Sequence, residues 1–483
     1  MAVLPAYSTV NEEALRGATR IRTLEIVCWL LLAMAALLGG LSFFSWRDCA
    51  LALLALPVLV LALWPHRHRR ADTQTQWMIT VSLILAALPL AYLLPLPLEW
   101  AVHLPGRDIR LQPAIGELGP GHWTAVSLAA DDTWQALLKL IPPLALFLAV
   151  LRLTAPQRLR LLGVVLGIVL LQSLWGLAQL SGDADGVLVF YGADGQYRAS
   201  GSFANRNHFA SLLLLGLPLL AVLACSGNWG WKRPAHTGWR MVGTLGLLLV
   251  SIALLASRSR AAAGLLFMEG CLFGAWLLHQ RRASRGLFVA GGAATLSLAV
   301  ILLFAPYPLF SGIQLDIVDG RLGILQRSLA AALDFFPLGA GPGTFGSIFP
   351  GFDTLATLDK VYVNHAHNDV LELLFELGAL GIGLYIAALS AIASGLWRHA
   401  RRRGGDGVQW ACALGLFALL VHGWVDYPVR VPLVAMVALT LFGVMLGPSE
   451  SPSTSRTGSG EAATDGRAQA PHSRSARASV AAA

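Results

Sequence analysis

The chain has 483 residues, of which 56% are hydrophobic and only 13% are charged. Soluble globular proteins carry about a quarter charged residues, so this composition excludes an ordinary water-soluble globule and a disordered chain. The net charge of +8 does not indicate nucleic-acid binding, because a Lys and Arg excess in so apolar a chain is first expected in cytoplasmic loops.

Apolar runs long enough to cross a bilayer recur along the chain. The first run is too long for the core of a signal peptide, so we expect it to remain as a membrane span. A window of about 20 residues predicts an all-α polytopic membrane protein with about twelve transmembrane helices. The predicted spans are 24–44, 49–64, 77–98, 134–152, 161–180, 209–225, 241–256, 261–279, 286–305, 370–397, 408–424 and 430–447.

Basic residues predict the orientation of these spans. With both termini in the cytoplasm, every inside segment is basic and the outside segments carry few basic residues, as the positive-inside rule requires. The inside segments between spans are 65–76, 153–160, 226–240, 280–285 and 398–407. The long outside segments are 99–133, 181–208 and 306–369.

The third outside segment contains a predicted helix of its own, over residues 321–335. Leucines recur there at helical spacing, which predicts an amphipathic helix at or above the outer membrane interface. These leucines are Leu322, Leu325, Leu329 and Leu333. Residues 448–483 have no apolar run, so we expect a disordered cytoplasmic tail after a transmembrane domain of residues 1–447.

Basic residues on the outside are not explained by the topology rule and need another reason. Arg206 stands between Asn205 and Asn207 at the entrance to a span. The amides can cap the helix, and the arginine can contact a ligand or extend to the interface as an anchor.

Arg258 and Arg260 share a tight turn without a nearby acid in the sequence. Because a guanidinium binds phosphate through a planar fork of donors, this turn is a candidate phosphate site, with interfacial anchoring as the alternative.

A third cluster begins at Asp319-Gly320-Arg321 and continues in the glycine-rich segment 337–345. The glycines permit a tight turn and a close approach of a ligand to backbone N–H groups, although a plain loop has the same composition. The lysine of a nucleotide phosphate loop is absent, so that kind of site is excluded.

A fourth cluster contains His365 and His367, which can face the same side of an extended segment. With Asp369 or Glu372 they could bind a metal, but the spacing is not the i, i+4 spacing of a helical zinc site. Histidine suits proton transfer better here. Asn368 and Asp369 also fit the N-cap of the span that follows.

Three other charged residues lie in or next to spans. Lys139 and Glu269 fall within predicted spans, where a charge is costly and marks a functional candidate, unless the two pair with each other. Arg430 begins the last span, and we interpret it as an interfacial anchor.

Together these clusters resemble the signature of the O-antigen ligase and polymerase superfamily. The resemblance covers about residues 160–445, and the combination of a Gly-Pro-Gly-Thr-Phe segment with a His-Asn-Asp segment is its most specific part. The segments that carry it are 205–209, 259–261, 319–321, 337–345, 365–378 and 422–428.

The resemblance implies a multi-pass transferase of the GT-C type in the bacterial inner membrane, with its active site on the periplasmic side. Such enzymes take a glycan from undecaprenyl diphosphate and need no nucleotide sugar, metal or other cofactor. Ligases pass the glycan to lipid A-core, and polymerases pass it to another lipid-linked repeat. We expect a ligase that inverts the anomeric configuration, with an O-antigen or exopolysaccharide polymerase as the alternative. Its partners would be these donors and acceptors together with membrane lipids.

Carried onto this chain, the resemblance implies that Arg206 and Arg260 hold the diphosphate and that His367 is the acid or base. The remaining expected substrate contacts are Arg258, Arg321, His365, Asn205, Asn207 and Asp369. Arg260 is preferred over its neighbour because Ala261 follows it, and His367 because an asparagine follows it. A transporter of lipid-linked glycan would instead place charges along a central path, but the arginines and histidines gather on one membrane side.

Overall fold

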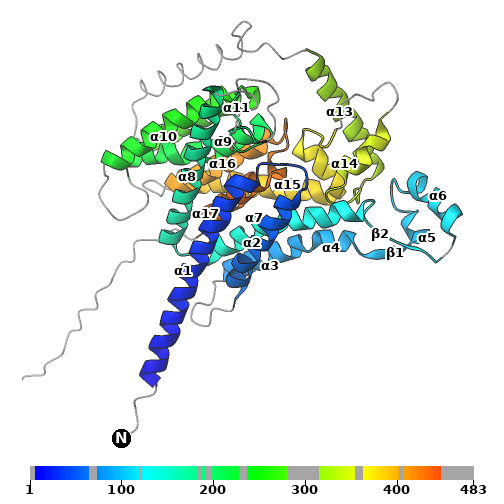
Figure 1. Ribbon diagram of the computed structural model, residues 1–483, viewed down its shortest axis with the longest axis horizontal. Helices are drawn as coiled ribbons and strands as arrows, with labels where there is room; N and C mark the ends of the chain where they lie inside the picture. The colour runs from blue at the N-terminus through cyan, green and yellow to red at the C-terminus, as the bar shows by residue number, and fades with distance from the viewer. Residues whose placement is uncertain are drawn as a thin grey trace, which may run out of the picture. The chain divides into compact units, whose positions relative to one another are not determined.

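The computed structural model describes residues 6–64, 73–119, 121–181, 188–190, 198–227, 237–280, 315–353, 363–401 and 407–447 (Figure 1). The predicted span 286–305 and the predicted tail 448–483 lie outside these residues. The same holds for most of the basic segment 65–76 and for the side chain of Arg321.

Helices make up most of the described chain, and the two strands form one small antiparallel sheet. In the N-terminal half the elements are α1 (Ala6–Leu38), α2 (Trp46–Leu63), α3 (Thr73–Ala86), α4 (Leu88–Tyr92), β1 (Pro95–Pro97), α5 (Leu98–Ala101), α6 (Asp108–Leu118), β2 (Trp123–Ala125), α7 (Ala130–Arg152), α8 (Ala155–Ala178) and the 3-10 turn η1 (Gln179–Ser181). The rest of the chain forms α9 (Arg206–Ser226), α10 (Thr237–Ala256), α11 (Arg260–His279), α13 (Leu315–Asp334), α14 (Phe345–Ile348), η2 (Phe349–Phe352), α15 (Asp369–Arg401), α16 (Gly407–His422), η3 (Pro428–Arg430) and α17 (Pro432–Leu446).

Among the described residues, nine helices are long and apolar enough to cross a membrane, and α16 and α17 are shorter apolar helices. Each predicted span in this part of the chain coincides with one of these eleven, where α3 and α4 together form the third span. The all-α polytopic membrane fold is therefore confirmed. The count of twelve and the GT-C arrangement stay predictions.

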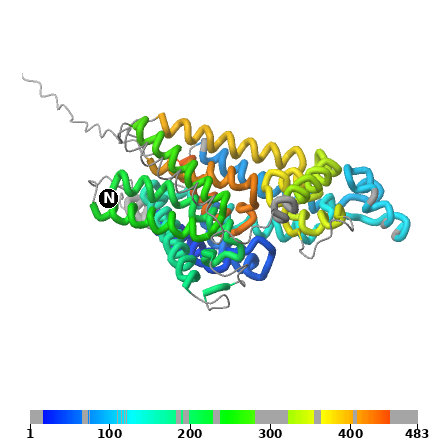
Figure 2. The backbone as a smooth tube through the Cα atoms, turned by 90° about the horizontal axis from the view of Figure 1, so that it is seen from above, coloured from blue at the N-terminus to red at the C-terminus, as the bar shows by residue number. Residues whose placement is uncertain are grey.

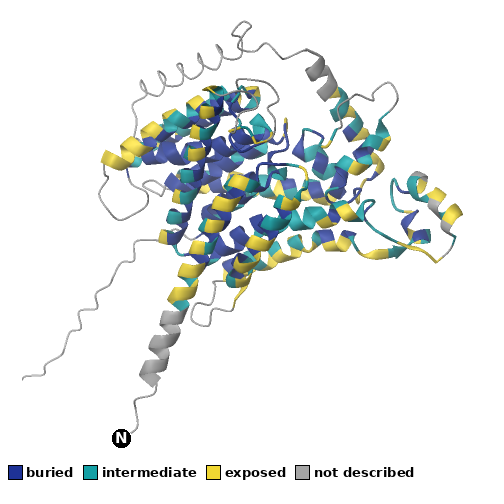
Figure 3. Cartoon of the chain, in the orientation of Figure 1, coloured by how far each residue is buried: buried dark blue, intermediate teal, exposed yellow. Residues whose placement is uncertain are grey.

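The centre of the helix bundle is α9. Of its apolar window 83% is buried, whereas the corresponding share is 33% or less for α1, α2 and the third span. The helices α8, α10, α11, α16 and α17 all contact α9, and Figure 3 shows the buried residues gathered there. A helix that is apolar on every side needs such a surround.

Polar caps fix where the helices of the candidate site begin. Asn205 caps α9 by accepting a hydrogen bond from the N–H of Asn207 at 2.8 Å. Asn368 caps α15 in the same way, since its Oδ1 accepts from the N–H groups of Val370 and Leu371, each at 3.0 Å. These interactions satisfy N–H groups that the first turn leaves unpaired. The predicted helix caps at Asn205 and Asn368 are confirmed.

The glycine-rich segment packs onto α15 instead of forming an open loop. Gly378 has φ 58°, which breaks the helical path of α15, and the N–H of Ala379 donates to the carbonyl of Pro337 at 2.9 Å. A Cβ at Gly378 would lie 2.0 Å from that carbonyl oxygen. The N–H of Gly341 likewise donates to the carbonyl of Glu376. The close approach that the glycines permit is thus an approach of two backbone segments.

The predicted helix in the third outside segment is confirmed as α13, which contacts α15 (Figures 1 and 2). Its buried side is made of small residues such as Ala331 and Ala332. Leu322, Leu329 and Leu333 are exposed, so these leucines do not pack on the protein. Their position at a membrane interface stays a prediction.

Candidate active site

Three segments that are far apart in the sequence meet at the side chain of Tyr427. Its ring lies 4.1 Å from the ring of His365, 4.7 Å from that of His208 and 5.0 Å from that of His367, measured between centroids. These residues come from the start of α9, the loop before α15 and the turn after α16. We call His208, His365, His367, Asp426 and Tyr427 the histidine cluster.

Asp426 is the buried anion of the histidine cluster. Its Oδ1 lies 3.6 Å from Nε2 of His208 and 3.8 Å from Nδ1 of His367, and it accepts a hydrogen bond from the N–H of Tyr427 at 2.9 Å. Burial alone would raise the pKa of the Asp426 carboxyl, but the two neighbouring histidines hold it well below its ordinary value. An ionised carboxylate therefore faces two imidazoles, an arrangement that orients a histidine and stabilises it when it gains a proton.

Of the two imidazoles beside Asp426, only that of His367 is accessible. Its side chain is 29% exposed, compared with 1% for His208. His367 has φ 51°, a conformation that costs a non-glycine residue energy and often marks a functional site. Because Nδ1 faces Asp426, the opposite ring nitrogen is the one available to a substrate. His367 therefore has the exposure and the partner that a general base requires.

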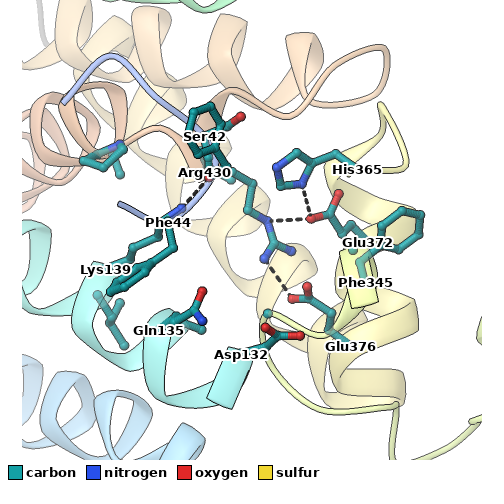
Figure 4. Close-up of a pocket in the computed structure, with 18 of the residues that line it drawn as sticks. Ser42, Phe44, Asp132, Gln135, Lys139, Phe345, His365, Glu372, Glu376 and Arg430 are labelled. Atoms are coloured by element: carbon teal, nitrogen blue, oxygen red, sulfur yellow. Dashed lines mark hydrogen bonds and ion pairs between the residues drawn. The ribbon is translucent and has the colours of Figure 1, made fainter. Parts of the chain in front are cut away.

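His365 is held by a second carboxylate. Its Nδ1 lies 2.8 Å from Oε1 of Glu372, whose other oxygen accepts from the N–H of Ala366 at 3.2 Å. Arg430 completes the network, with Nη1 at 2.8 Å from Oε2 of Glu376 and Nε at 3.4 Å from Oε1 of Glu372 (Figure 4).

This network shows that the interpretation of Arg430 as an interfacial anchor was wrong. Its guanidinium binds two buried carboxylates, and its side chain is only 20% exposed. One signal in the sequence could have indicated this role. Glu372 and Glu376 are four residues apart, so they lie on the same face of a helix, and two buried carboxylates side by side require a cation.

The first predicted arginine lies next to the histidine cluster. Arg206 is the first residue of α9 and follows Asn205, whose side chain interacts with the phenol of Tyr427. Burial raises the pKa of this phenol, so Tyr427 remains protonated near neutral pH. Asn207 contributes its backbone, donating to Asn205 and accepting from the hydroxyl of Ser211 at 2.9 Å.

The other two predicted arginines lie between α10 and α11, Arg258 in the turn and Arg260 as the first residue of α11. Arg260 is exposed, and Arg258 is half-buried with φ 56°. The turn is fixed by Ser257, whose buried hydroxyl accepts from the N–H of Ser259 at 3.2 Å. The N–H of Ala199 donates to the carbonyl of Ala256 at the end of α10, which joins this turn to the segment leading into α9. In the described residues no hydrogen bond or ion pair joins Arg258 or Arg260 to the histidine cluster. The backbone of Arg321 lies within α13.

Asp369 and His422 are buried near the cluster. Asp369 is buried, and its N–H donates to the carbonyl of Gly423 at 2.7 Å. His422 is also buried, with Nδ1 2.8 Å from the hydroxyl of Ser211. These contacts join α9, α15 and α16 and hold the elements of the cluster together.

The two charges within predicted spans do not pair with each other. Lys139 donates to the carbonyl of Ser42. Glu269 is buried, and neither of its carboxylate oxygens has a hydrogen-bond partner among the described residues. In the same part of the chain no group of three or more His, Cys, Asp or Glu side chains has a metal-binding arrangement.

A comparison with protein families gives a match to the model described as O-antigen ligase, over residues 245–386. The matched region contains Arg258, Arg260, His365 and His367, and it includes the glycine-rich segment and the first half of α15. No curated protein matches the sequence. The match confirms the resemblance found in the motifs and supports the O-antigen ligase and polymerase superfamily for this part of the chain.

Proposed function

We propose that this protein transfers a glycan from undecaprenyl diphosphate to an acceptor hydroxyl at the periplasmic face of the bacterial inner membrane. The observation that carries the proposal is the assembly of the histidine cluster. An accessible imidazole lies beside a buried, ionised carboxylate, and the arginine-bearing start of α9 adjoins both. The superfamily supports a lipid-linked glycan as the substrate.

In the proposed reaction His367 takes the proton of the acceptor hydroxyl as the oxygen attacks the anomeric carbon. The new glycosidic bond forms while the bond from that carbon to the diphosphate oxygen breaks, so a direct displacement inverts the configuration. The proton stays on the imidazole, where the charge of Asp426 stabilises it. The leaving diphosphate keeps the electron pair.

The diphosphate gains negative charge as it leaves, and fixed positive charge lowers the energy of that transition state. We assign this task to Arg206 and Arg260, whose guanidinium groups can hold phosphate oxygens through two parallel hydrogen bonds. Arg258 and Arg321 are proposed to assist, and the amides of Asn205 and Asn207 to shape the entrance. For Asp369 we propose a supporting role, because this residue is buried.

We favour a ligase that uses lipid A-core as its acceptor over a polymerase. A glycan-length ladder from cells with and without the gene tests the function and separates the two. Loss of a ligase should leave lipid A-core without long glycan, while chains of normal length stay on the carrier lipid. Loss of a polymerase should leave single repeats. An unchanged ladder would contradict both and would favour a transport or structural role.

A further inference from the structure

A cavity of about 580 Å³ adjoins the histidine cluster. It lies between α7, α15 and α17, and residues 42–44 also line it. His365 belongs to both the cavity and the cluster, whereas His367 and Asp426 do not line the cavity. The reaction proposed above places no substrate group there, so the cavity needs its own explanation.

The charges in this cavity disfavour a diphosphate. Two cations, Arg430 and Lys139, line it together with three carboxylates, those of Asp132, Glu372 and Glu376. The fixed charges therefore sum to one negative unit. The guanidinium of Arg430 is already bound to both glutamates. An anion that approached this guanidinium would therefore also be repelled by two carboxylates.

The polar atoms that remain suit hydroxyl groups. Nη2 of Arg430 and Oδ2 of Asp132 are buried and have no hydrogen-bond partner in the described part of the chain. The amide of Gln135 lies next to them in Figure 4 and can both donate and accept. A donor, an acceptor and an amide in one cavity match the alternating donors and acceptors of a sugar. Phe44 and Phe345 add aromatic surface for the apolar face of a sugar ring.

Part of the cavity lining is apolar. Leu140 of α7 and Ala435 and Leu439 of α17 line it, and these residues lie within helices that match predicted spans. The volume is ordinary for a small-molecule site and exceeds what a single sugar ring fills. An occupant that fits both kinds of lining has hydroxyl groups and an apolar surface, as an uncharged sugar ring does.

We propose that this cavity is the acceptor subsite and that it binds an uncharged sugar of the acceptor glycan. The inference rests on the proposed transfer reaction and divides its site into two halves. The donor diphosphate binds next to Arg206 and Arg260. The acceptor sugar binds in the cavity next to Arg430. His365 and His367 both contact the ring of Tyr427, so a sugar held beside His365 lies one ring away from the base.

Direct binding to the full-length protein in lipid nanodiscs tests this inference without any turnover. The probes are decyl β-glucoside, which has an uncharged sugar head, and decyl phosphate, which has the same chain and an anionic head. We expect saturable binding of the glucoside and at least tenfold weaker binding of the phosphate. Equal or tighter binding of the phosphate would overturn the proposal and would assign the cavity to an anionic lipid.

Two variants and a control locate the binding. Ala435→Phe narrows the cavity and should weaken glucoside binding about tenfold or more, as overpacking does. Gln135→Leu removes the amide and should weaken it about three- to tenfold, as expected for one lost hydrogen bond. Ala387→Phe adds the same ring on an exposed face of α15 and should bind as the wild type does. Unchanged binding in Gln135→Leu and in a folded Ala435→Phe would show that the glucoside binds elsewhere.

Kinetics separates this inference from the proposed function. If transfer occurs, Gln135→Leu should raise the KM for the acceptor while the Kd for the donor stays unchanged. If no transfer occurs but the glucoside binds as described, the reaction is wrong and the sugar site stands. Transfer with an unchanged acceptor KM in Gln135→Leu would overturn the subsite and leave the reaction intact.

Discussion

Replacing Asp426 with asparagine removes the charge of the histidine cluster and keeps nearly the same side-chain volume. The structure places this charge 3.8 Å from Nδ1 of His367. At an effective dielectric constant of about 20, a unit charge at this distance stabilises an imidazolium by about 4 kcal/mol. Since about 1.4 kcal/mol corresponds to a factor of ten in rate, the full interaction corresponds to about 10³-fold.

The measured effect should be somewhat smaller than this limit. Solvent reaches His367, whose side chain is 29% exposed, and His208 shares the same carboxylate oxygen. We therefore expect Asp426→Asn to reduce the transfer rate about 10²- to 10³-fold while the protein still folds and binds the lipid-linked donor.

The assay is single-turnover transfer in proteoliposomes with a saturating acceptor, and donor binding is measured separately. Asp353→Asn is the matched control. Asp353 also forms an ion pair, with Nε of Arg327 at 3.2 Å from its Oδ1, but it does not belong to the histidine cluster. It should transfer at the wild-type rate. Two results would refute the reasoning: wild-type transfer by Asp426→Asn, or a loss that is fully explained by weaker donor binding.

Three further predictions concern charges and topology. Arg430→Lys should lower the free energy of unfolding by about 1.5–3 kcal/mol, because one ammonium cannot serve both carboxylates as the guanidinium does. Thermal unfolding in detergent would measure this against Arg398→Lys, an exposed control expected within about 0.5 kcal/mol of wild type. Arg260→Lys should keep stability and lose most transfer, since lysine lacks the planar fork of donors, and full transfer would remove Arg260 from the diphosphate site. Cysteines placed at Glu117 and Arg401 should react with an impermeant thiol reagent from opposite sides of the membrane, and labelling from one side would overturn the orientation.

The helices could be predicted from the sequence because a membrane span is recognisable from its own residues. Each needs a continuous apolar run of a fixed length, so a sliding window finds it without knowledge of its neighbours. The starts of α9 and α15 were equally local, because one asparagine side chain bonds to N–H groups two or three residues ahead. The sequence motifs at these two starts therefore predicted correctly that Asn205 and Asn368 lie at helix ends.

The pairing of charges could not be predicted in the same way. The contact of Arg430 with Glu376 joins residues 54 positions apart, and it depends on how the turn before α17 packs against α15. The approach of Asp426 to His208 joins α9 to the turn after α16 and likewise exists only in the folded chain. A single sequence contains the members of such networks but not their distances. The buried side of α13 was missed for another reason, since alanines give a weaker hydropathy signal than the exposed leucines.

The most direct test of the central claim is transfer by purified wild-type protein and by His367→Ala, with undecaprenyl-diphosphate-linked glycan as the donor and lipid A-core as the acceptor. The wild type should form the product. His367→Ala should bind the donor with unchanged Kd and transfer about 10²- to 10⁴-fold more slowly, the usual contribution of a general base. His365→Ala should keep most of the rate when the acceptor is saturating. Wild-type transfer by His367→Ala, or inactivity of His365→Ala alone, would contradict the account.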